Sequence, residues 1–300
     1  MTDNIISSTQ NPKIKRLLAL QQKSSERRKA GLFVVEGCRE VEHCLEAGYE
    51  VESLFVSEEF HSSCVPSCVP SCVPSVASGK PSAVASGKPS TVASGQRSST
   101  LFTGEAPCSS LYTVTPKVYE HIAYRGSTEG IVAIVKARHL TLDDLQLGPA
   151  PLIVVLESVE KPGNLGAILR SADAAGADAV IVCDPLTDLY NPNLIRSSIG
   201  AVFTVPTVAC TSEACITFLK ARGIQILTAQ LQDSLPYYDT PMTIPTALVM
   251  GTESTGLTQQ WRQAATAHIR IPMLGRLDSL NVSVSTAILL YEAVRQRQAQ

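Results

Sequence analysis

The chain has 300 residues, of which 44% are hydrophobic and 5% aromatic, and its formal net charge at pH 7 is −2. This length allows one large domain or two ordinary ones with aliphatic cores, and the total charge alone does not imply a nucleic-acid partner. No apolar run is long enough to span a membrane, and the polar segment Met1 to Gln10 does not resemble a signal peptide. We therefore expect a cytoplasmic protein with no membrane partner, whose nine cysteines stay reduced.

The first 60 residues alternate helix-like and strand-like stretches. A helix is predicted over Pro12–Gln21, where a proline stands near the start and aliphatic residues form a stripe. Leu32–Val35 and Val51–Val56 are predicted strands. Between them Gly37–Ala47 is a predicted helix, which Gly48 ends.

The first 30 residues carry an excess of positive charge, with seven basic side chains against Asp3 and Glu26 and a net charge of +5. The basic residues are Lys13, Lys15, Arg16, Lys23, Arg27, Arg28 and Lys29. Such a segment can dock on phosphates, or it can be a solvated helix face. Charge alone leaves both interpretations open.

Residues 62–110 consist of short repeats. Ser-Cys-Val-Pro recurs every four residues and then Val-Ala-Ser-Gly every eight, so that Pro or Gly interrupts the chain every few residues. Such a segment cannot bury enough apolar surface to offset its ordering entropy, and we predict a disordered insertion in a surface loop. The spacing of Cys64, Cys68 and Cys72 is not that of a usual zinc site, so repeat expansion is favoured and no metal is predicted.

After the insertion the first unit resumes. Leu111–Val114 and Ile131–Val135 are predicted strands, with a short helix over Pro116–His121 between them. Residues 141–150 are polar, contain proline and are predicted to be a linker. We therefore place a domain boundary there, with one unit over residues 1–140 and a second over 151–300.

From residue 151 onward, apolar strands alternate regularly with amphipathic helices. The predicted strands are Leu152–Leu156, Ala179–Cys183, Val202–Val205, Ile224–Thr228, Thr246–Met250 and Ile269–Ile271. The predicted helices are Asn164–Ala175, Asn193–Ile199, Ser212–Arg222 and Leu280–Arg297. This alternation indicates an α/β fold with a parallel sheet covered on both faces. The last helix is too apolar for one stripe, so it should be buried on more than one side, inside the domain or in a homodimer interface.

Three short segments place glycines or polar residues where predicted strands end. They read Asn-Leu-Gly-Ala-Ile-Leu-Arg over 164–170, Met-Gly-Thr-Glu-Ser-Thr-Gly-Leu over 250–257, and Ile-Pro-Met over 271–273 followed by Ser-Leu-Asn-Val-Ser-Val over 279–284. Open α/β sheets bind their ligands at this edge. The Gly-x-Gly-x-x-Gly, Walker and Gly-x-Ser-x-Gly patterns are absent, which disfavours a dehydrogenase, a P-loop enzyme and an α/β-hydrolase.

Each segment alone also has a purely structural interpretation. Asn164 can cap the helix that follows it, and Arg170 can bind an anion such as an RNA phosphate or form a surface salt bridge. Glu253 can contact a ligand through the glycine loop or be a solvated carboxylate. Ser279 or Asn281 can be a plain cap of the last helix.

Taken together and in this order, the three segments resemble the motifs of the SpoU-type RNA ribose 2′-O-methyltransferases, which belong to the TrmH-like SPOUT class. The N-terminal part is similar to that family's RNA substrate-binding domain through residues 11–15, 33–40 and 129–133. The resemblance covers nearly the whole chain except residues 62–110. Lys161 stands where many members are acidic, and Ser171 stands where threonine is common.

The resemblance implies an architecture, a cofactor and partners. Residues 151–300 would form a parallel-sheet methyltransferase domain with a deep trefoil knot, and residues 1–140 a small ribosomal-protein-like α/β RNA-binding domain. The cofactor would be S-adenosyl-L-methionine, with no metal. The partners would be structured RNA, either rRNA or tRNA, and a second copy of the chain, because the family builds its site at a homodimer interface.

The resemblance also assigns roles to residues. The implied catalytic residues are Asn164, Arg170, Glu253, Ser279 and Asn281. The implied cofactor-binding residues are Met250, Gly251, Glu253, Ile271, Met273, Leu280 and Asn281. The implied RNA-binding residues are Lys13, Lys15, Arg16, Arg27, Arg39 and Arg170.

The expected reaction moves a methyl group to a ribose 2′-OH. A guanidinium is effectively never deprotonated in a protein, so we expect Arg170 to hold an RNA phosphate and stabilise the developing alkoxide rather than act as the base. Two alternatives stay open, a non-catalytic RNA-binding protein of the same fold and a methyltransferase acting on a base. The Ser-Leu-Asn of the third segment favours ribose.

Overall fold

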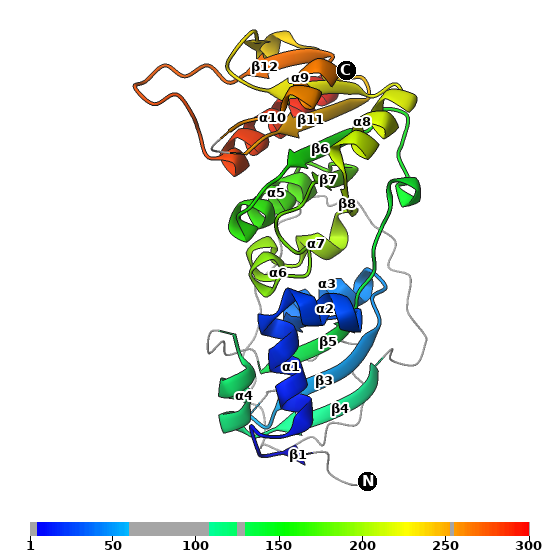
Figure 1. The fold of residues 1–300 in the computed structure, drawn as a ribbon, viewed down its shortest axis with the longest axis vertical. Coiled ribbons are helices and arrows are strands. Elements are labelled where there is room, and N and C mark those ends of the chain that lie inside the picture. Colours follow the sequence, from blue (N-terminus) through cyan, green and yellow to red (C-terminus); the bar gives the residue numbers. More distant parts are fainter. Residues whose placement is uncertain (1–4, 60–107, 125–129, 253–254, 300) are drawn as a thin grey trace, which may run out of the picture.

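The computed structural model describes residues 5–59, 108–124, 130–252 and 255–299. They form two sheets, one at each end of an elongated molecule, with helices between them (Figure 1). The predicted insertion lies outside the described residues over 62–107. Its last three residues, 108–110, were assigned wrongly, because they pair with the neighbouring strand as regular β-structure.

The N-terminal domain has a five-stranded mixed sheet in the order β1-β4-β3-β5-β2. Its strands are β1 (Ile5–Ile6), β2 (Leu32–Glu36), β3 (Val51–Ser57), β4 (Cys108–Val114) and β5 (Ile131–Lys136). Its helices are α1 (Pro12–Gln22), α2 (Ser24–Ala30), α3 (Cys38–Glu46) and α4 (Pro116–Ile122). Side chains alternate across each strand, so Val34 packs with α1 and α4 while Phe33 and Val35 pack on the opposite side with α3.

The C-terminal domain has a seven-stranded sheet, parallel throughout, in the order β10-β12-β9-β11-β6-β7-β8. Its strands are β6 (Leu152–Glu157), β7 (Ala179–Cys183), β8 (Thr207–Cys210), β9 (Gln225–Ala229), β10 (Leu235–Pro236), β11 (Thr246–Met250) and β12 (Ala267–Arg270). Its helices are α5 (Pro162–Ala174), α6 (Pro192–Ser198), α7 (Ala201–Thr204), α8 (Ser212–Ala221), α9 (Gln259–Ala264) and α10 (Val282–Gln298). The trefoil knot stays a prediction.

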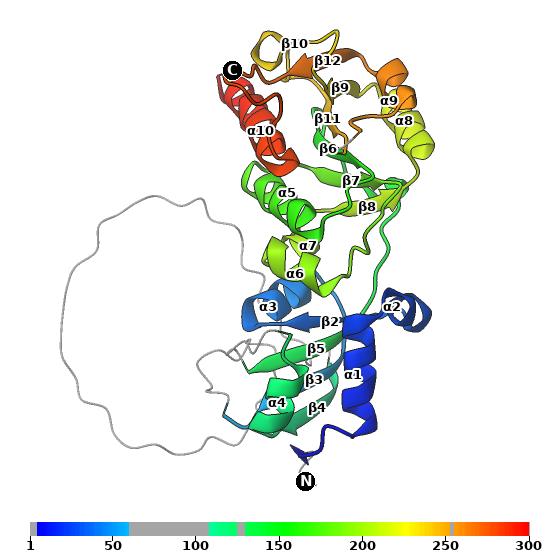
Figure 2. The same ribbon diagram turned by 60° about the vertical axis from the view of Figure 1, so that its left-hand side comes forward.

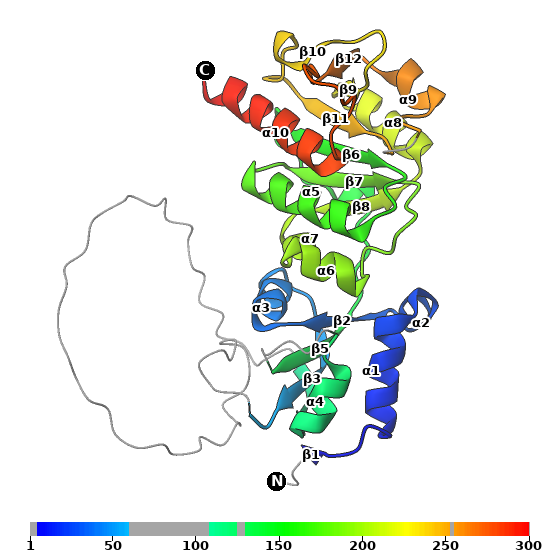
Figure 3. The same ribbon diagram turned by 90° about the vertical axis from the view of Figure 1, so that its left-hand side faces the viewer.

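Helices cover both faces of this sheet, as the alternation predicted. Val154 and Leu156 of β6 belong to the core that α5 and α10 complete, while Ile153 and Val155 belong to the core that α8 and α9 complete. Figure 2 shows the two helix layers on opposite sides of the strands, and Figure 3 shows α5 and α10 side by side over one face. The strands are buried on both faces, which explains their continuous apolar sequences.

Two predicted elements differ from the structure. The segment predicted as a strand over Val202–Val205 forms helix α7 instead, because Gly200 adopts a left-handed conformation with φ of 80° and starts a new helical turn. The strand follows after Pro206, over β8. Helix α5 begins two residues before Asn164, since Pro162 is suited to a first helical turn, and Lys161 holds the N-cap position that we predicted for Asn164.

Helix α10 buries one face against the rest of the chain. Val282, Leu289 and Leu290 are buried, but Val284 and Tyr291 are 47% and 52% exposed. The prediction of burial on several sides therefore does not hold within one chain, and an apolar stripe is left on the outer side of the helix. None of the helices in the described part of the chain is long and apolar enough to cross a membrane.

The two domains share one hydrophobic core rather than being joined only by the linker. Phe33 of β2 stacks on Tyr190 with ring centroids 4.1 Å apart and packs against Phe203 of α7 at 5.9 Å. The Tyr190 hydroxyl accepts a hydrogen bond from the backbone amide of Arg138 at 3.0 Å. We call this contact of Phe33 with Tyr190 and Phe203 the domain seam. It fixes the position of the N-terminal domain relative to the parallel sheet.

Candidate active site

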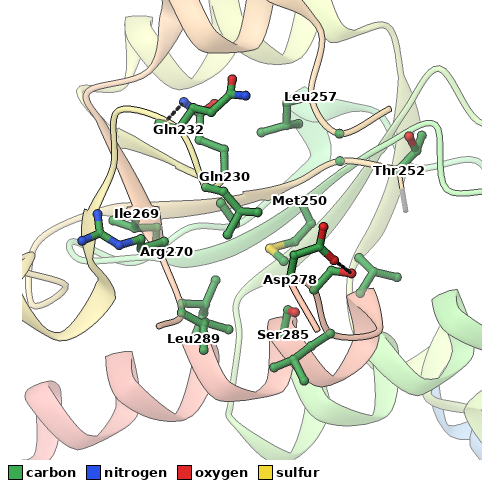
Figure 4. Close-up of a pocket in the computed structure, with 18 of the residues that line it drawn as sticks. Gln230, Gln232, Met250, Thr252, Leu257, Ile269, Arg270, Asp278, Ser285 and Leu289 are labelled. Carbon is green, nitrogen blue, oxygen red and sulfur yellow. Dashed lines mark hydrogen bonds between the residues drawn. The ribbon is translucent and has the colours of Figure 1, made fainter. Parts of the chain in front are cut away.

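The carboxyl ends of β9, β11 and β12 meet the loop before α10 and enclose a cavity of about 580 Å³ (Figure 4). Because the strands are parallel, their ends lie at one edge of the sheet, where α/β folds bind ligands. Apolar side chains, among them Met250, Leu257, Ile269 and Leu289, form part of the wall. Gln230, Arg270 and Asp278 add polar groups.

The structure brings nearly all the predicted cofactor residues into this cavity. Those that line it are Met250, Gly251, Ile271, Met273, Leu280 and Asn281. Glu253, predicted both for catalysis and for cofactor binding, lies outside the described residues. The second and third sequence motifs therefore meet around one cavity, although residues 258–270 separate them in the chain.

The second motif forms a tight loop that only glycine permits at position 251. A Cβ atom at Gly251 would lie 2.4 Å from the carbonyl carbon of Gly256, and backbone atoms cannot move aside as a flexible side chain can. The amide of Gly256 donates to the carbonyl of Thr252 at 3.1 Å, and Gly256 itself has a φ of 67°. The loop thus presents bare backbone to the cavity, which allows close approach by a ligand.

A buried carboxylate holds this loop to the central strand. Glu157 at the end of β6 is 2% exposed, and its two oxygens accept hydrogen bonds from the amide of Thr258 at 2.8 Å and from its hydroxyl at 2.6 Å. Glu157 was not among the residues predicted for the site. Its signal was weak, since it is one carboxylate at the end of an otherwise apolar strand.

We expect Glu157→Ala to weaken cofactor binding and to destabilise the fold by about 2–3 kcal/mol, because two hydrogen bonds to a buried charge are lost. Glu157→Gln should have a smaller effect, since its amide can accept only one of the two bonds. Calorimetric titration with S-adenosylmethionine and urea unfolding would measure both quantities. Glu213→Ala, at an exposed carboxylate of α8, is the control. Unchanged cofactor binding in Glu157→Ala would show that the contact of Glu157 with Thr258 does not hold the loop in place.

Gln230 and Arg262 line the cavity, and each also has a buried polar atom. Gln230 Oε1 and Arg262 Nε are inaccessible to solvent, and neither has a hydrogen-bond partner among the described residues. The Asp278 carboxylate lines the same cavity and can pair with a positively charged ligand such as S-adenosylmethionine.

Gln230, Arg262 and Asp278 were not predicted as site residues, although the position of Gln230 after a predicted strand could have indicated it. It follows the predicted strand Ile224–Thr228 and so lies at the same sheet edge as the motifs. Asp278 lies directly before the Ser279 of the third motif and accepts a hydrogen bond from its hydroxyl at 3.2 Å. Arg262 comes from α9, a helix that the sequence pattern did not reveal.

The first and third motifs meet through two asparagines. Asn281 Nδ2 donates to Asn164 Oδ1 at 3.2 Å, and Asn281 Oδ1 caps α10 by accepting from the amide of Ser283 at 2.9 Å. Asn164 lines a smaller cavity of about 110 Å³, which shares Gly251 and Val282 with the larger one. Asn281 is therefore a helix cap and a contact between motifs at once.

Arg170 lies apart from these residues. Its side chain is exposed on α5 and lines neither of the two cavities. It forms no ion pair with any residue in the described ranges. The structure thus brings Asn164, Ser279 and Asn281 together but leaves the predicted catalytic arginine outside the cavity of its own chain.

The predicted RNA-binding residues differ in their surroundings. Lys13, Lys15, Arg16 and Arg39 are exposed. Lys13 stands 3.8 Å from the ring centre of Tyr112, and Arg16 pairs with Glu52 at 3.0 Å.

Arg27 does not fit the RNA-binding role that its charge suggested. It is only 5% exposed, and its Nε lies 2.6 Å from Asp188 Oδ2 of the C-terminal domain. Its Nη1 also donates to the carbonyls of Leu20 and Gln21. A buried guanidinium whose donors are used in this way binds the two domains together and cannot contact RNA.

Residues 151–291 match the SpoU rRNA Methylase family, and residues 11–133 match the MRM3-like substrate binding domain. The 23S rRNA (guanosine-2′-O-)-methyltransferase RlmB of Vibrio vulnificus strain CMCP6 is 39% identical over 196 residues, which cover 63% of this chain and 79% of the relative. The chain belongs to the SpoU rRNA methylase family. Both the predicted family and the predicted α/β architecture are therefore confirmed.

Other members of the SpoU family match over nearly the full length. The 23S rRNA (guanosine(2553)-2′-O)-methyltransferase RlmP of Bacillus subtilis strain 168 is 28% identical over 286 residues, covering 95% of this chain and 97% of the relative. The structure of an AdoMet bound rRNA methyltransferase from Sinorhizobium meliloti superposes with a TM-score of 0.78 at 28% identity, covering 97% of this chain and 98% of that one. That relative binds AdoMet, which is S-adenosylmethionine, the cofactor predicted from the sequence of this chain.

Proposed function

We propose that this chain transfers a methyl group from S-adenosylmethionine to the ribose 2′-OH of a guanosine in 23S rRNA. The observation that carries the proposal is the cavity at the carboxyl edge of the sheet, where residues of two family motifs meet. The RNA target is supported by the relatives, whose names specify guanosine 2′-O-methylation of 23S rRNA.

The cofactor would be held by backbone around Gly251 and Ile271 and by the side chains of Met250, Met273 and Leu280. When bound, S-adenosylmethionine supplies an electrophilic methyl group on a positively charged sulfur. The protein therefore needs only to hold the acceptor in line with that group and to assist loss of its proton. The tight packing at Gly251 lets backbone approach a ligand closely, and the apolar wall can contact its uncharged parts.

The acceptor ribose would be oriented by Asn164 and Asn281, whose side chains are already joined, with Ser279 and Glu253 completing the site. Arg170 would hold the phosphate and stabilise the alkoxide as it develops. Because Arg170 lines neither cavity of its own chain, we place its action in a homodimer, where it can face the cavity of a second copy.

The N-terminal domain would hold the RNA through Lys13, Lys15, Arg16 and Arg39. Their exposed positive charges can contact the phosphate backbone without reading sequence. The shared core at the domain seam would then fix the distance between bound RNA and the cofactor cavity.

Methyl transfer from labelled S-adenosylmethionine to unmodified 23S rRNA and to tRNA, followed by alkaline hydrolysis, tests the proposal. A 2′-O-methyl group blocks cleavage at its own phosphodiester, so we expect label in alkali-resistant dinucleotides from 23S rRNA. Label in mononucleotides would show base methylation, and label only from tRNA would overturn the target. Cofactor binding without transfer to either RNA would favour the non-catalytic alternative.

We expect the purified chain to be a dimer by multi-angle light scattering, held in part by the outer face of α10. Replacing the exposed apolar residues by aspartate, in Val284→Asp with Tyr291→Asp, should give a folded monomer that has lost methyl transfer. The control pair is Glu213→Ala on α8 with Arg222→Ala at the C-cap of that helix. A wild-type monomer at working concentration would contradict the dimer.

A further inference from the structure

Three cysteines that are distant in the sequence converge at one point of the C-terminal domain. Cys183 is the last residue of β7, Cys210 is the last residue of β8, and the two are paired neighbours in the sheet. Cys215 lies on the first turns of α8. The three Sγ atoms all lie within 4.8 Å of one another.

The scaffold around the thiols is rigid and leaves an approach from one side. The start of α8 is held by Ser212, whose hydroxyl donates to Asp184 at 2.6 Å and accepts from the indole of Trp261 at 3.0 Å. Cys183 and Cys215 are fully buried, whereas Cys210 is only partly buried. The cluster therefore has fixed positions and an entry path, which are two requirements of a metal site.

We propose that Cys183, Cys210 and Cys215 bind one thiophilic metal ion with a filled d shell, of the class of Zn²⁺ or Cu⁺. Thiolate sulfur is the ligand that such ions prefer. Metal–sulfur bonds of about 2.3 Å require sulfur–sulfur separations of about 3.8 Å, so the thiols need only a small inward movement. Three S–H protons leave to solvent as three metal–sulfur bonds form, with no change of oxidation state.

The site is separate from the active site. None of the three cysteines lines the cavity at the ends of β9, β11 and β12. The ion would instead join β8, the strand at one end of the sheet, to β7 and α8. Its role is therefore structural, since it would fasten an edge strand whose outer side is met, among the described residues, only by a single β-bridge from Val208 to Leu140.

The test uses the full-length, reduced protein with Cd²⁺ as the probe, because cadmium–thiolate bonds absorb in the ultraviolet. The repeat cysteines are removed first, in Cys64→Ser with Cys68→Ser and Cys72→Ser, so that they cannot bind the probe. In this background we expect one Cd²⁺ per chain and a higher melting temperature, since the ion binds only the folded state. Adding Cys210→Ser should abolish both effects.

The matched control is Cys38→Ser, at a partly buried thiol outside the cluster, which should keep both effects. Metal analysis of protein from zinc-rich and copper-rich cultures would then distinguish the two ions. Equal Cd²⁺ binding with and without Cys210 would overturn the proposal. A Cys183–Cys210 disulfide in protein purified without reductant would also overturn it, in favour of a redox pair.

Discussion

Replacing Arg170 by alanine is expected to lower methyl transfer by at least about 10²–10³-fold, the cost of removing one group that stabilises developing negative charge. Binding of S-adenosylmethionine should stay nearly unchanged, because Arg170 does not line the cavity of its own chain and is expected to hold the RNA phosphate rather than the cofactor. Single-turnover transfer to 23S rRNA and calorimetric titration with the cofactor would separate the two effects. Arg170→Lys should be intermediate, since lysine keeps the charge but loses the planar fork.

The control for this prediction is Arg222→Ala, at the exposed arginine that caps the C-terminus of α8 and whose guanidinium packs over the ring of Phe218 at 4.6 Å. It should retain full activity. Wild-type turnover in Arg170→Ala would remove the arginine from the mechanism.

Mixed dimers would show whether Arg170 acts on the other copy. A dimer of Arg170→Ala with Asn281→Ala contains one complete site if each arginine serves its partner, and none if it serves its own chain. Recovery of activity on co-expression would thus support the arrangement proposed here. Absence of recovery, with mixed dimers present, would place Arg170 in its own chain's site.

The arrangement of elements could be predicted because burial determines the sequence pattern. Strands buried on both faces must be continuously apolar, so β6, β7 and β11 are evident from the sequence. Helix α7 could not be predicted in this way, since a four-residue apolar segment that fills a domain seam looks like a buried strand. Only the left-handed Gly200 before it distinguishes the two, and its conformation is not visible in the sequence.

The candidate site was predictable where it depends on local backbone and not where it depends on packing. Gly251 could be singled out because a glycine after an apolar strand indicates close approach to a ligand. Glu157 acts through its contact with Thr258, and Arg262 reaches the cavity from α9, and spacing in the sequence can show neither. Arg27 failed as an RNA contact for the same reason, because a basic segment does not reveal which of its charges is buried.

The cysteine cluster illustrates the limit of spacing arguments most clearly. The repeat cysteines Cys64, Cys68 and Cys72 are regularly spaced, but their spacing is not that of a usual zinc site, so no metal was predicted. Cys183, Cys210 and Cys215 have no recognisable ligand spacing. They meet only because β7 and β8 are neighbours in register and α8 returns over their ends.

Replacing Phe33 by alanine is expected to cost about 3–5 kcal/mol of stability, the usual range for a large aromatic removed from a core. Phe33 is fully buried and contacts both Tyr190 and Phe203, so the cavity would open at the seam between the domains. We expect lower RNA affinity and faster proteolysis in the linker at residues 141–150. Urea unfolding, filter binding to 23S rRNA and limited digestion with thermolysin, which cleaves before leucines such as those of the linker, would measure the three effects.

Phe55→Ala is the matched control, because Phe55 is equally buried and also packs against an aromatic ring, that of Tyr112 at 5.3 Å. It lies on the other face of the same sheet, away from the seam. It should therefore cost similar stability while leaving the linker protected and RNA affinity unchanged at temperatures where the protein stays folded. If the two variants behaved alike in proteolysis and RNA binding, the seam would contribute only stability, and RNA would reach the cofactor cavity without a fixed domain arrangement.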